Sequence, residues 1–215
     1  MNEPERLIPP HGGYRKLKSF QLAQLAYDVT ARFCDRYIER RSRTHDQMVQ
    51  AARSGAQNIA EGSQASGTSK KMELKLTNVA RASLEELRLD YEDYLRQHGL
   101  AHWPPEHPAL ARFKARRCAT LEEVRAWVQA ERRGRTPTDT DKQGRAETGK
   151  LSAQVRESPC RPGSAELVAN AALSLLNLGC HLLDKQIAAQ ENAFVEEGGF
   201  TERLYRVRSQ RRIRG

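Results

Sequence analysis

The residues of this chain best suited to chemistry are arginines, and the chemistry they favour is phosphate binding. Among 215 residues there are 36 Lys and Arg against 27 Asp and Glu, which gives a net charge of +9 and a pI of about 9.6. Arginine greatly exceeds lysine, and a guanidinium group can donate two parallel hydrogen bonds to the oxygens of one phosphate. The composition therefore favours a polyanionic partner.

The basic residues gather in three clusters. After Thr201, six arginines stand against one glutamate, an excess of +5 that is more than half of the net charge. A solvated, solubilising surface is the alternative for each cluster. No RNP motif, zinc finger or aromatic platform is present, so recognition of the phosphate backbone is expected rather than base reading. The predicted nucleic-acid-binding residues are Arg36, Arg40, Arg41, Arg43, Lys70, Lys71, Arg203, Arg206, Arg208, Arg211, Arg212 and Arg214.

Few residues are spaced for catalysis or metal binding. Glu61 and Glu86 could bind a metal or form an acid–base pair, but the histidine partners of di-metal sites in helix bundles are missing. His98, His102 and His107 are interrupted by a glycine and prolines, so they lack a fixed helical spacing. No P-loop, G-x-S-x-G, H-E-x-x-H or dinucleotide motif occurs. The sequence therefore predicts a protein that is not an enzyme and has no cofactor and no metal.

A further set of polar residues is expected to have a structural role. Ser54, Asn58 and Glu61 share one stripe of a predicted helix, next to its apolar side. A buried polar network between this helix and the next, or across subunits, would satisfy their hydrogen bonds. The members of this network are predicted to be Arg53, Ser54, Asn58, Glu61, Arg81, Ser83 and Glu86.

The elements that position these residues are predicted to be helices, since Leu and Ala far outnumber Val and Ile and no long period-two pattern occurs. Residues 50–95 indicate two amphipathic helices joined by a short turn. The first is expected to end at Gly62, and Ser69 is expected to cap the second. One side of the second helix carries Met72, Leu76, Val79, Ser83, Leu87, Tyr91 and Tyr94.

Two more long helices are predicted, one on each side of this pair. The helix at 20–41 has two apolar stripes that cover nearly half of its circumference. Such a wide arc indicates either contact with another subunit or a deeply buried helix. The helix at 164–197 begins after a Pro-Gly breaker. Its polar residues, Asn170, Ser174, Asn177, His181 and Asp184, are expected to face away from the core.

Residues 101–133 are expected to insert two short helices, at 109–117 and 120–133, and Thr120 with Glu123 forms a capping box at the start of the second. Residues 134–163 show no apolar periodicity, which predicts a disordered linker. The organisation is then three bundle helices in 14–100, the insertion in 101–133, the linker, a fourth helix in 164–197 and a basic suffix in 198–215. The predicted fold is all-α: an antiparallel up-down four-helix bundle with an inserted helical pair and a basic C-terminal tail.

The segments NIAEG at 58–62 and ARASLEEL at 80–87, with Arg53 and Ser54, resemble a known family. It comprises four-helix-bundle proteins encoded by intervening sequences of bacterial rRNA genes and the accessory variability determinants of diversity-generating retroelements. The resemblance covers about 14–99, and residues 186–208 resemble a variant with a C-terminal suffix. It implies an oligomeric bundle, often a pentamer, that binds nucleic acid and sometimes a reverse transcriptase. The compact members have a shorter connection before the fourth helix.

The sequence also bounds the location of the chain and leaves one functional alternative. The sequence contains no run of about 18 apolar residues, so no membrane span is predicted. The first residues lack the basic and apolar regions of a signal peptide, so a cytoplasmic protein is expected. The four cysteines show no C-x-x-C spacing, and Cys34 and Cys180 are expected to be small core residues. The alternative function is a protein–protein scaffold whose suffix docks a partner.

Overall fold

The computed structural model describes residues 7–134 and 163–214, and every regular element in these residues is a helix. The all-α prediction is therefore confirmed. The predicted linker at 134–163 lies outside the described residues except for its two terminal positions. The elements are η1 (Tyr14–Lys16), α1 (Lys18–Tyr37), α2 (Arg43–Ala65), α3 (Lys70–Gln97), α4 (Pro108–Arg116), α5 (Leu121–Arg133), α6 (Ser164–Glu197) and α7 (Phe200–Arg214).

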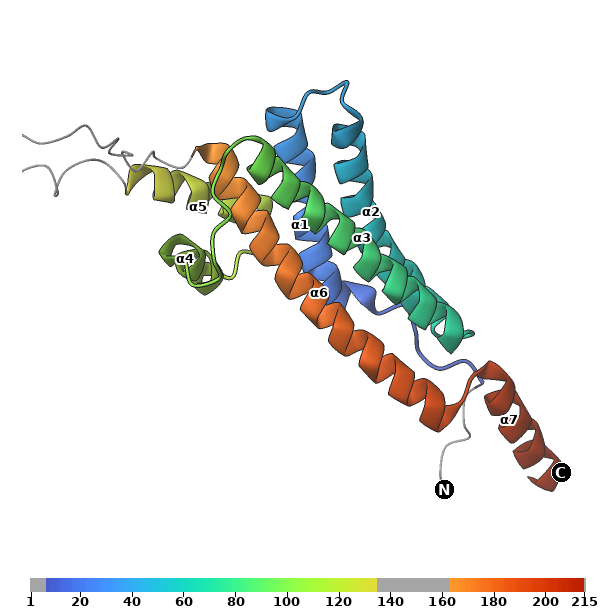
Figure 1. The fold of residues 1–215 in the computed structure, drawn as a ribbon. Coiled ribbons are helices and arrows are strands. Elements are labelled where there is room, and N and C mark those ends of the chain that lie inside the picture. The colour runs from blue at the N-terminus through green and yellow to red at the C-terminus, as the bar shows by residue number, and fades with distance from the viewer. Residues whose placement is uncertain (1–6, 135–162, 215) are drawn as a thin grey trace, which may run out of the picture.

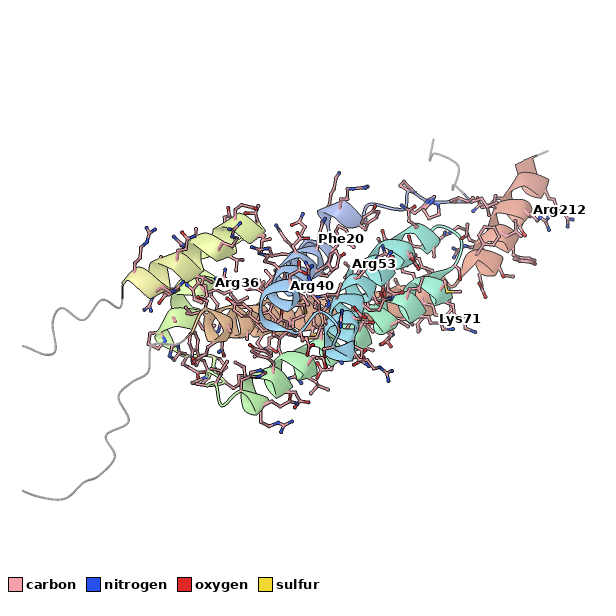
Figure 2. The ribbon with its side chains drawn as sticks, turned by 90° about the horizontal axis from the view of Figure 1, so that it is seen from above. Phe20, Arg36, Arg40, Arg53, Lys71 and Arg212 are labelled. Atoms are coloured by element: carbon pink, nitrogen blue, oxygen red, sulfur yellow. The ribbon has the colours of Figure 1, made fainter. Side chains whose placement is uncertain are left out.

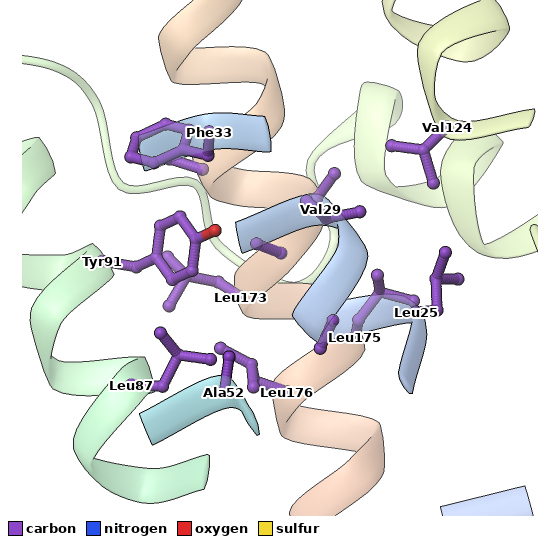
Figure 3. Close-up of a cluster of buried hydrophobic side chains, with 14 of the residues drawn as sticks. Leu25, Val29, Phe33, Ala52, Leu87, Tyr91, Val124, Leu173, Leu175 and Leu176 are labelled. Atoms are coloured by element: carbon purple, nitrogen blue, oxygen red, sulfur yellow. The ribbon is translucent and has the colours of Figure 1, made fainter. Parts of the chain in front are cut away.

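The long helices α1, α2, α3 and α6 build the body of the molecule (Figure 1). Both α1 and α3 pack against α2 and against α6. Their facing side chains form one hydrophobic core, in which Phe33 of α1 and Tyr91 of α3 have ring centroids 4.9 Å apart. Figure 3 shows this part of the core, with Leu87 of α3 and Leu176 of α6 beside it. Burial of this apolar surface is the main force that holds the four helices together.

The apolar side chains of α6 pack in the hydrophobic core. The stretch Ser164–Gln210 contains an 18-residue window that is apolar and long enough to cross a membrane, although the sequence alone had predicted none. Of that window, 67% is buried inside the fold. A single helix of this length and composition is weak evidence of a membrane span, because buried core helices pass the same test.

The predicted caps occur where local chemistry dictates them. The hydroxyl of Ser69 accepts from the backbone N–H of Met72 at the start of α3. Thr120 and Glu123 form the predicted capping box at the start of α5. α6 ends at Glu197, and Gly198 follows it with a φ of 73°, which is readily adopted only by glycine. Each of these signals lies within a few residues of the helix end that it sets.

The prediction that Gly62 ends the second helix is wrong, because α2 continues to Ala65. Gly62 is buried against α3, and a Cβ atom at this position would lie 3.3 Å from the carbonyl oxygen of Glu73 and 3.3 Å from Cβ of Leu76. Its role is close approach of two helices. Gly55 lies seven residues earlier on the same face of α2 and has a similar role, because a Cβ atom there would clash with the side chain of Leu84.

The predicted helix at 20–41 also ends earlier than expected. α1 stops at Tyr37 and Ile38 is extended, with φ −118° and ψ 139°. Arg40 and Arg41 therefore lie in the turn to α2 rather than on a helix. The wide apolar arc of α1 is accounted for within the chain, since α1 packs on α2, α6, α5 and η1. The arc is that of a buried helix, and it no longer supports contact with a second subunit.

The predicted apolar stripe of α3 is only partly buried. Leu87 and Tyr91 are fully buried as expected, but Met72 is 44% exposed and Val79 is 41% exposed. The stripe of α3 that α2 and α6 cover lies next to the predicted one. Its first half carries small residues, which allow α2 and α6 to approach α3 closely. The buried residues of α3 are Thr77, Ala80, Leu84, Leu87, Tyr91 and Leu95.

Asn170, which was expected to face away from the core, is 1% exposed. Its Oδ1 accepts from the backbone N–H of Trp103 at 2.8 Å, and its Nδ2 donates to the carbonyl of Ala101 at 2.9 Å. The Trp103 indole donates to Glu166 Oε1 at 3.0 Å. The extended segment after α3 has no helical partners for its own backbone, so side chains of α6 satisfy it.

The inserted pair α4 and α5 forms close to the predicted ranges. The rings of Phe113 and Trp127 pack with centroids 4.8 Å apart, and Arg112 donates two hydrogen bonds of 2.7 Å to the carboxylate of Glu131. α5 contacts α1 and α6, and α4 contacts α6. The pair therefore covers one side of the body near the start of α6 (Figure 1).

Candidate nucleic-acid interface

The predicted basic residues lie at two opposite ends of the molecule. Figure 2 shows Arg36 and Arg40 toward one end, and Lys71 and Arg212 toward the other. The first end is formed by the turn between α1 and α2, and the second by the start of α3 together with α7. The structure therefore does not bring all predicted residues into one surface.

At the α1–α2 end, Arg36, Arg40, Arg41 and Arg43 are all exposed. The Arg36 guanidinium lies over the Tyr37 ring, 5.6 Å from its centroid. Arg40 lies 3.6 Å from the carboxylate of Asp35, but both side chains are largely exposed, so this ion pair is weak. A phosphate can displace such a partner at little cost.

At the other end, the predicted residues have different environments. Lys70 lies 3.5 Å from Glu73, and Lys71 is exposed. Arg203 is only 8% exposed and lies 4.0 Å from Glu197, so it is a structural residue of α7 rather than a phosphate ligand. The exposed arginines of α7 are Arg206, Arg208 and Arg212, whereas the side chains of Arg211 and Arg214 lie outside the described part of the structure.

α7 also exposes an aromatic residue that the sequence had not singled out. Tyr205 is 74% exposed. It precedes Arg208 by three residues and Arg212 by seven, so the three side chains share one face of the helix. An exposed ring between arginines offers a stacking surface for a base beside ligands for its phosphate.

The predicted polar network does not form between α2 and α3 of one chain in the described residues. Arg53, Glu61 and Glu86 are exposed. Asn58 donates to the backbone carbonyl of Ser54 at 2.9 Å. Arg81 instead donates to Asp184 of α6 at 2.6 Å. Ser54, Ser83 and Glu86 do line one shallow depression of about 320 Å³, and pairing across subunits stays a prediction.

The histidines considered as metal ligands have packing partners. The His98 ring stacks on Tyr94 and the His107 ring stacks on Trp103, each with centroids 4.1 Å apart. His107 also accepts from the backbone N–H of Ala109 at the start of α4. In residues 7–134 and 163–214, no group of three or more His, Cys, Asp or Glu could hold a metal ion. Cys34 and Cys180 are buried free thiols, as expected.

The sequence missed three arginines that lie close to Arg36. Arg32 is on the same helix, one turn earlier, and Arg125 and Arg132 reach the same groove from α5. No local pattern could have found this set, because about 90 residues separate its two halves. Docking of the inserted helices on α1 creates the cluster.

Asp90 of α3 is the carboxyl group whose titration should most affect stability. Its Oδ2 atom is buried without a hydrogen-bond partner, and burial, with Glu86 and Asp93 nearby, raises its pKa from 3.8 to about 6. Below pH 3.8 the group is neutral in the folded and unfolded chains, so it costs nothing. Above pH of about 6 it is charged in both, and the folded chain bears the full cost.

We therefore expect Asp90→Asn to stabilise the protein at neutral pH. The gain in unfolding free energy should be about 1 kcal/mol at about pH 7, after allowance for solvent screening, and should vanish near about pH 3.5. Urea unfolding of the variant and the original chain at both pH values measures it. A gain of equal size at the two pH values would show that ionisation is not the cause.

The described fold and site define an all-α protein with exposed arginines at two ends. Comparison of the chain with models of protein families, with curated proteins and with solved structures finds no match. The arrangement of basic side chains is therefore what supports a function for this chain.

Proposed function

We propose that the chain is a non-enzymatic, homo-oligomeric, antiparallel up-down four-helix bundle that binds RNA or DNA through the basic side chains at its ends. The observation that carries this proposal is α7, a helix beyond α6 that exposes Arg206, Arg208 and Arg212. By its resemblance to accessory variability determinants, the chain would form a pentamer that serves a retroelement reverse transcriptase. A reverse-transcriptase gene and a variable repeat are then expected beside its own gene.

The helix fixes the spacing of the α7 arginines. Arg208 and Arg212 are one turn apart, so their guanidinium groups can contact neighbouring phosphates without further ordering of the backbone. Glu202 is the single acidic residue of α7, and its Oε2 accepts from the backbone N–H of Gly199. The exposed surface of the helix therefore stays positive, which attracts a polyanion from a distance.

A salt titration with a paired variant tests this proposal. We expect Arg208→Gln with Arg212→Gln to weaken binding of duplex DNA, and to reduce the slope of log K against log salt by about 2, because each lost phosphate contact removes about 0.9. Arg53→Gln with Lys185→Gln removes the same charge from exposed positions on α2 and α6 and is the control. Equal slopes for the two double variants would remove α7 from the binding surface.

Assembly has its own support in the exposed apolar side chains of the body. Met72 and Val79 lie seven residues apart on one stripe of α3, and both are more than 40% exposed. A neighbouring copy that covered this stripe would remove it from water. The mass of the intact assembly in solution, measured by light scattering, tests this part of the proposal, and a monomer at every concentration would contradict it.

A scaffold role is the second candidate, and one groove favours it. The groove lies between α1, α6 and the α4–α5 pair and has a volume of about 1300 Å³. Leu22, Leu178 and Leu182 line it, and Leu178 is 49% exposed. A protein partner that stays bound after nuclease treatment and in high salt would favour this role, whereas loss of the partner under both conditions would favour nucleic acid.

A further inference from the structure

A small groove between α1 and α5 gathers four arginines. Its volume is about 290 Å³. Arg32 and Arg36 line it from α1, where they are four residues apart, and Arg125 and Arg132 line it from α5, where they are seven residues apart. Each pair therefore lies on one face of its helix, and the two faces meet across the groove.

The floor of this groove is apolar and buried. Val29, Phe33 and Val124 are between 0% and 2% exposed. Figure 3 shows Val29 of α1 and Val124 of α5 on the facing sides of the two helices. A floor of this kind lowers the local dielectric constant, so a charge held against it interacts more strongly with the arginines than it would in water.

Nearby carboxylates lie outside the groove: Asp28, Asp35 and Glu122 line the larger neighbouring groove, which Arg32 also borders. The residues that line the groove include no Asp or Glu, and no ion pair involves these arginines in the described residues. Some arginines elsewhere in the fold have a carboxylate partner, as Arg112 has Glu131 and Arg81 has Asp184. Four like charges around one concavity repel each other unless an anion neutralises them.

The charge indicates the class of anion. One phosphate group carries about −1.5 to −2 at neutral pH, so a single phosphate leaves half of the positive charge unbalanced. A chain of two or three phosphates balances four guanidinium groups, each of which can grip two oxygens. The volume is at the lower limit of about 300 Å³ for ligand pockets, which suits a short phosphate chain. We infer that this groove binds a polyphosphate group.

Two molecules carry such a group: a free nucleoside triphosphate and the 5′ end of a nascent RNA. Tyr37 lines the groove beside Arg36 and offers a ring to an attached base. The inference does not depend on the proposed nucleic-acid binding by α7, because the groove lies at the other end of the molecule and a small anion suffices to test it (Figure 2).

The test is calorimetric titration of the full chain with inorganic tripolyphosphate at about 0.15 M salt. We expect Arg32→Gln with Arg125→Gln to weaken binding at least about tenfold, because both sides of the groove lose a ligand. Arg53→Gln, on an exposed position of α2, should bind as the original chain does. No measurable binding by the original chain, or an equal loss in Arg53→Gln, would overturn the inference. So would a tenfold loss that follows Arg208→Gln with Arg212→Gln instead.

Thermal unfolding separates this role from a structural one. Without ligand, Arg32→Gln with Arg125→Gln should melt at the same temperature as the original chain or higher, since repulsion is relieved. Tripolyphosphate should raise the melting temperature of the original chain but not of the variant. A variant that melts lower without ligand and is still stabilised by tripolyphosphate would contradict the proposal.

The source of the phosphate chain is resolved by two more ligands. If ATP binds within about tenfold of tripolyphosphate, a free nucleotide fits the groove. If RNA with a 5′-triphosphate binds at least about tenfold more tightly than the same RNA with a 5′-hydroxyl, and Arg32→Gln with Arg125→Gln abolishes the difference, the RNA end fits it. If tripolyphosphate binds but neither ATP nor RNA with a 5′-triphosphate does, the assignment of the groove to either of these two molecules is overturned. Loss of RNA binding in the α7 variant alone would bear only on the proposed function.

Discussion

Replacing Tyr91 by alanine is expected to lower the free energy of unfolding by about 3–5 kcal/mol, because a large aromatic ring is removed from a closed core. Tyr91 is 0% exposed, and its ring packs on Phe33 of α1. Its hydroxyl donates to Thr30 Oγ1 at 3.1 Å, and Thr30 in turn donates to the carbonyl of Ala26. The cavity would therefore open at the contact that joins α1 to α3.

Two matched variants divide this loss into its causes. Tyr91→Phe keeps the ring and removes one hydrogen bond, so about 1 kcal/mol should be lost, since Thr30 stays bonded to Ala26. Tyr205→Ala removes the same side chain from a position that is 74% exposed and should change stability by less than about 0.5 kcal/mol. Denaturant unfolding at one protein concentration measures all three variants. A loss below about 1.5 kcal/mol for Tyr91→Ala would mean that the Tyr91 ring is not enclosed against Phe33 as described.

Helix ends could be predicted wherever the signal is local. The hydroxyl of Ser69, the Thr120–Glu123 capping box and Gly198 each act on backbone groups within four residues, so the sequence alone contains the whole interaction. The helix at 164–197 was predicted with its observed bounds for the same reason. Glycine at the end of a helix and glycine at a helix contact, however, look alike in sequence. Gly62 was assigned to the first class and belongs to the second.

Burial could not be predicted where it depends on a distant segment. Asn170 looked like a solvent-facing residue because its partners, at 101 and 103, reach it only after the chain has folded back. Arg203 looked like one of six equivalent arginines, yet it is buried beside Glu197. The four-arginine groove is the clearest case, since Arg32 and Arg125 become neighbours only when α5 docks on α1.

Asn170→Ala should lower the free energy of unfolding by about 1–3 kcal/mol. The change leaves the buried N–H of Trp103 without its partner, and an unsatisfied buried backbone group costs about 1–3 kcal/mol; the carbonyl of Ala101 also loses its donor, but Ala101 is exposed and water can replace it. Asn177→Ala is the matched control, because Asn177 is on the same helix but exposed, and it should change little.

The chemistry of the side chain can be tested at the same position. Asn170→Asp keeps an acceptor for Trp103 but places a second oxygen opposite the carbonyl of Ala101, so it should also destabilise the protein, because Ala101 loses its donor and the oxygens repel. Asn170→Asp at full stability would show that the Ala101 bond contributes nothing. Asn170→Ala at full stability would show that the segment before α4 is held by Trp103 packing and its bond to Glu166 alone.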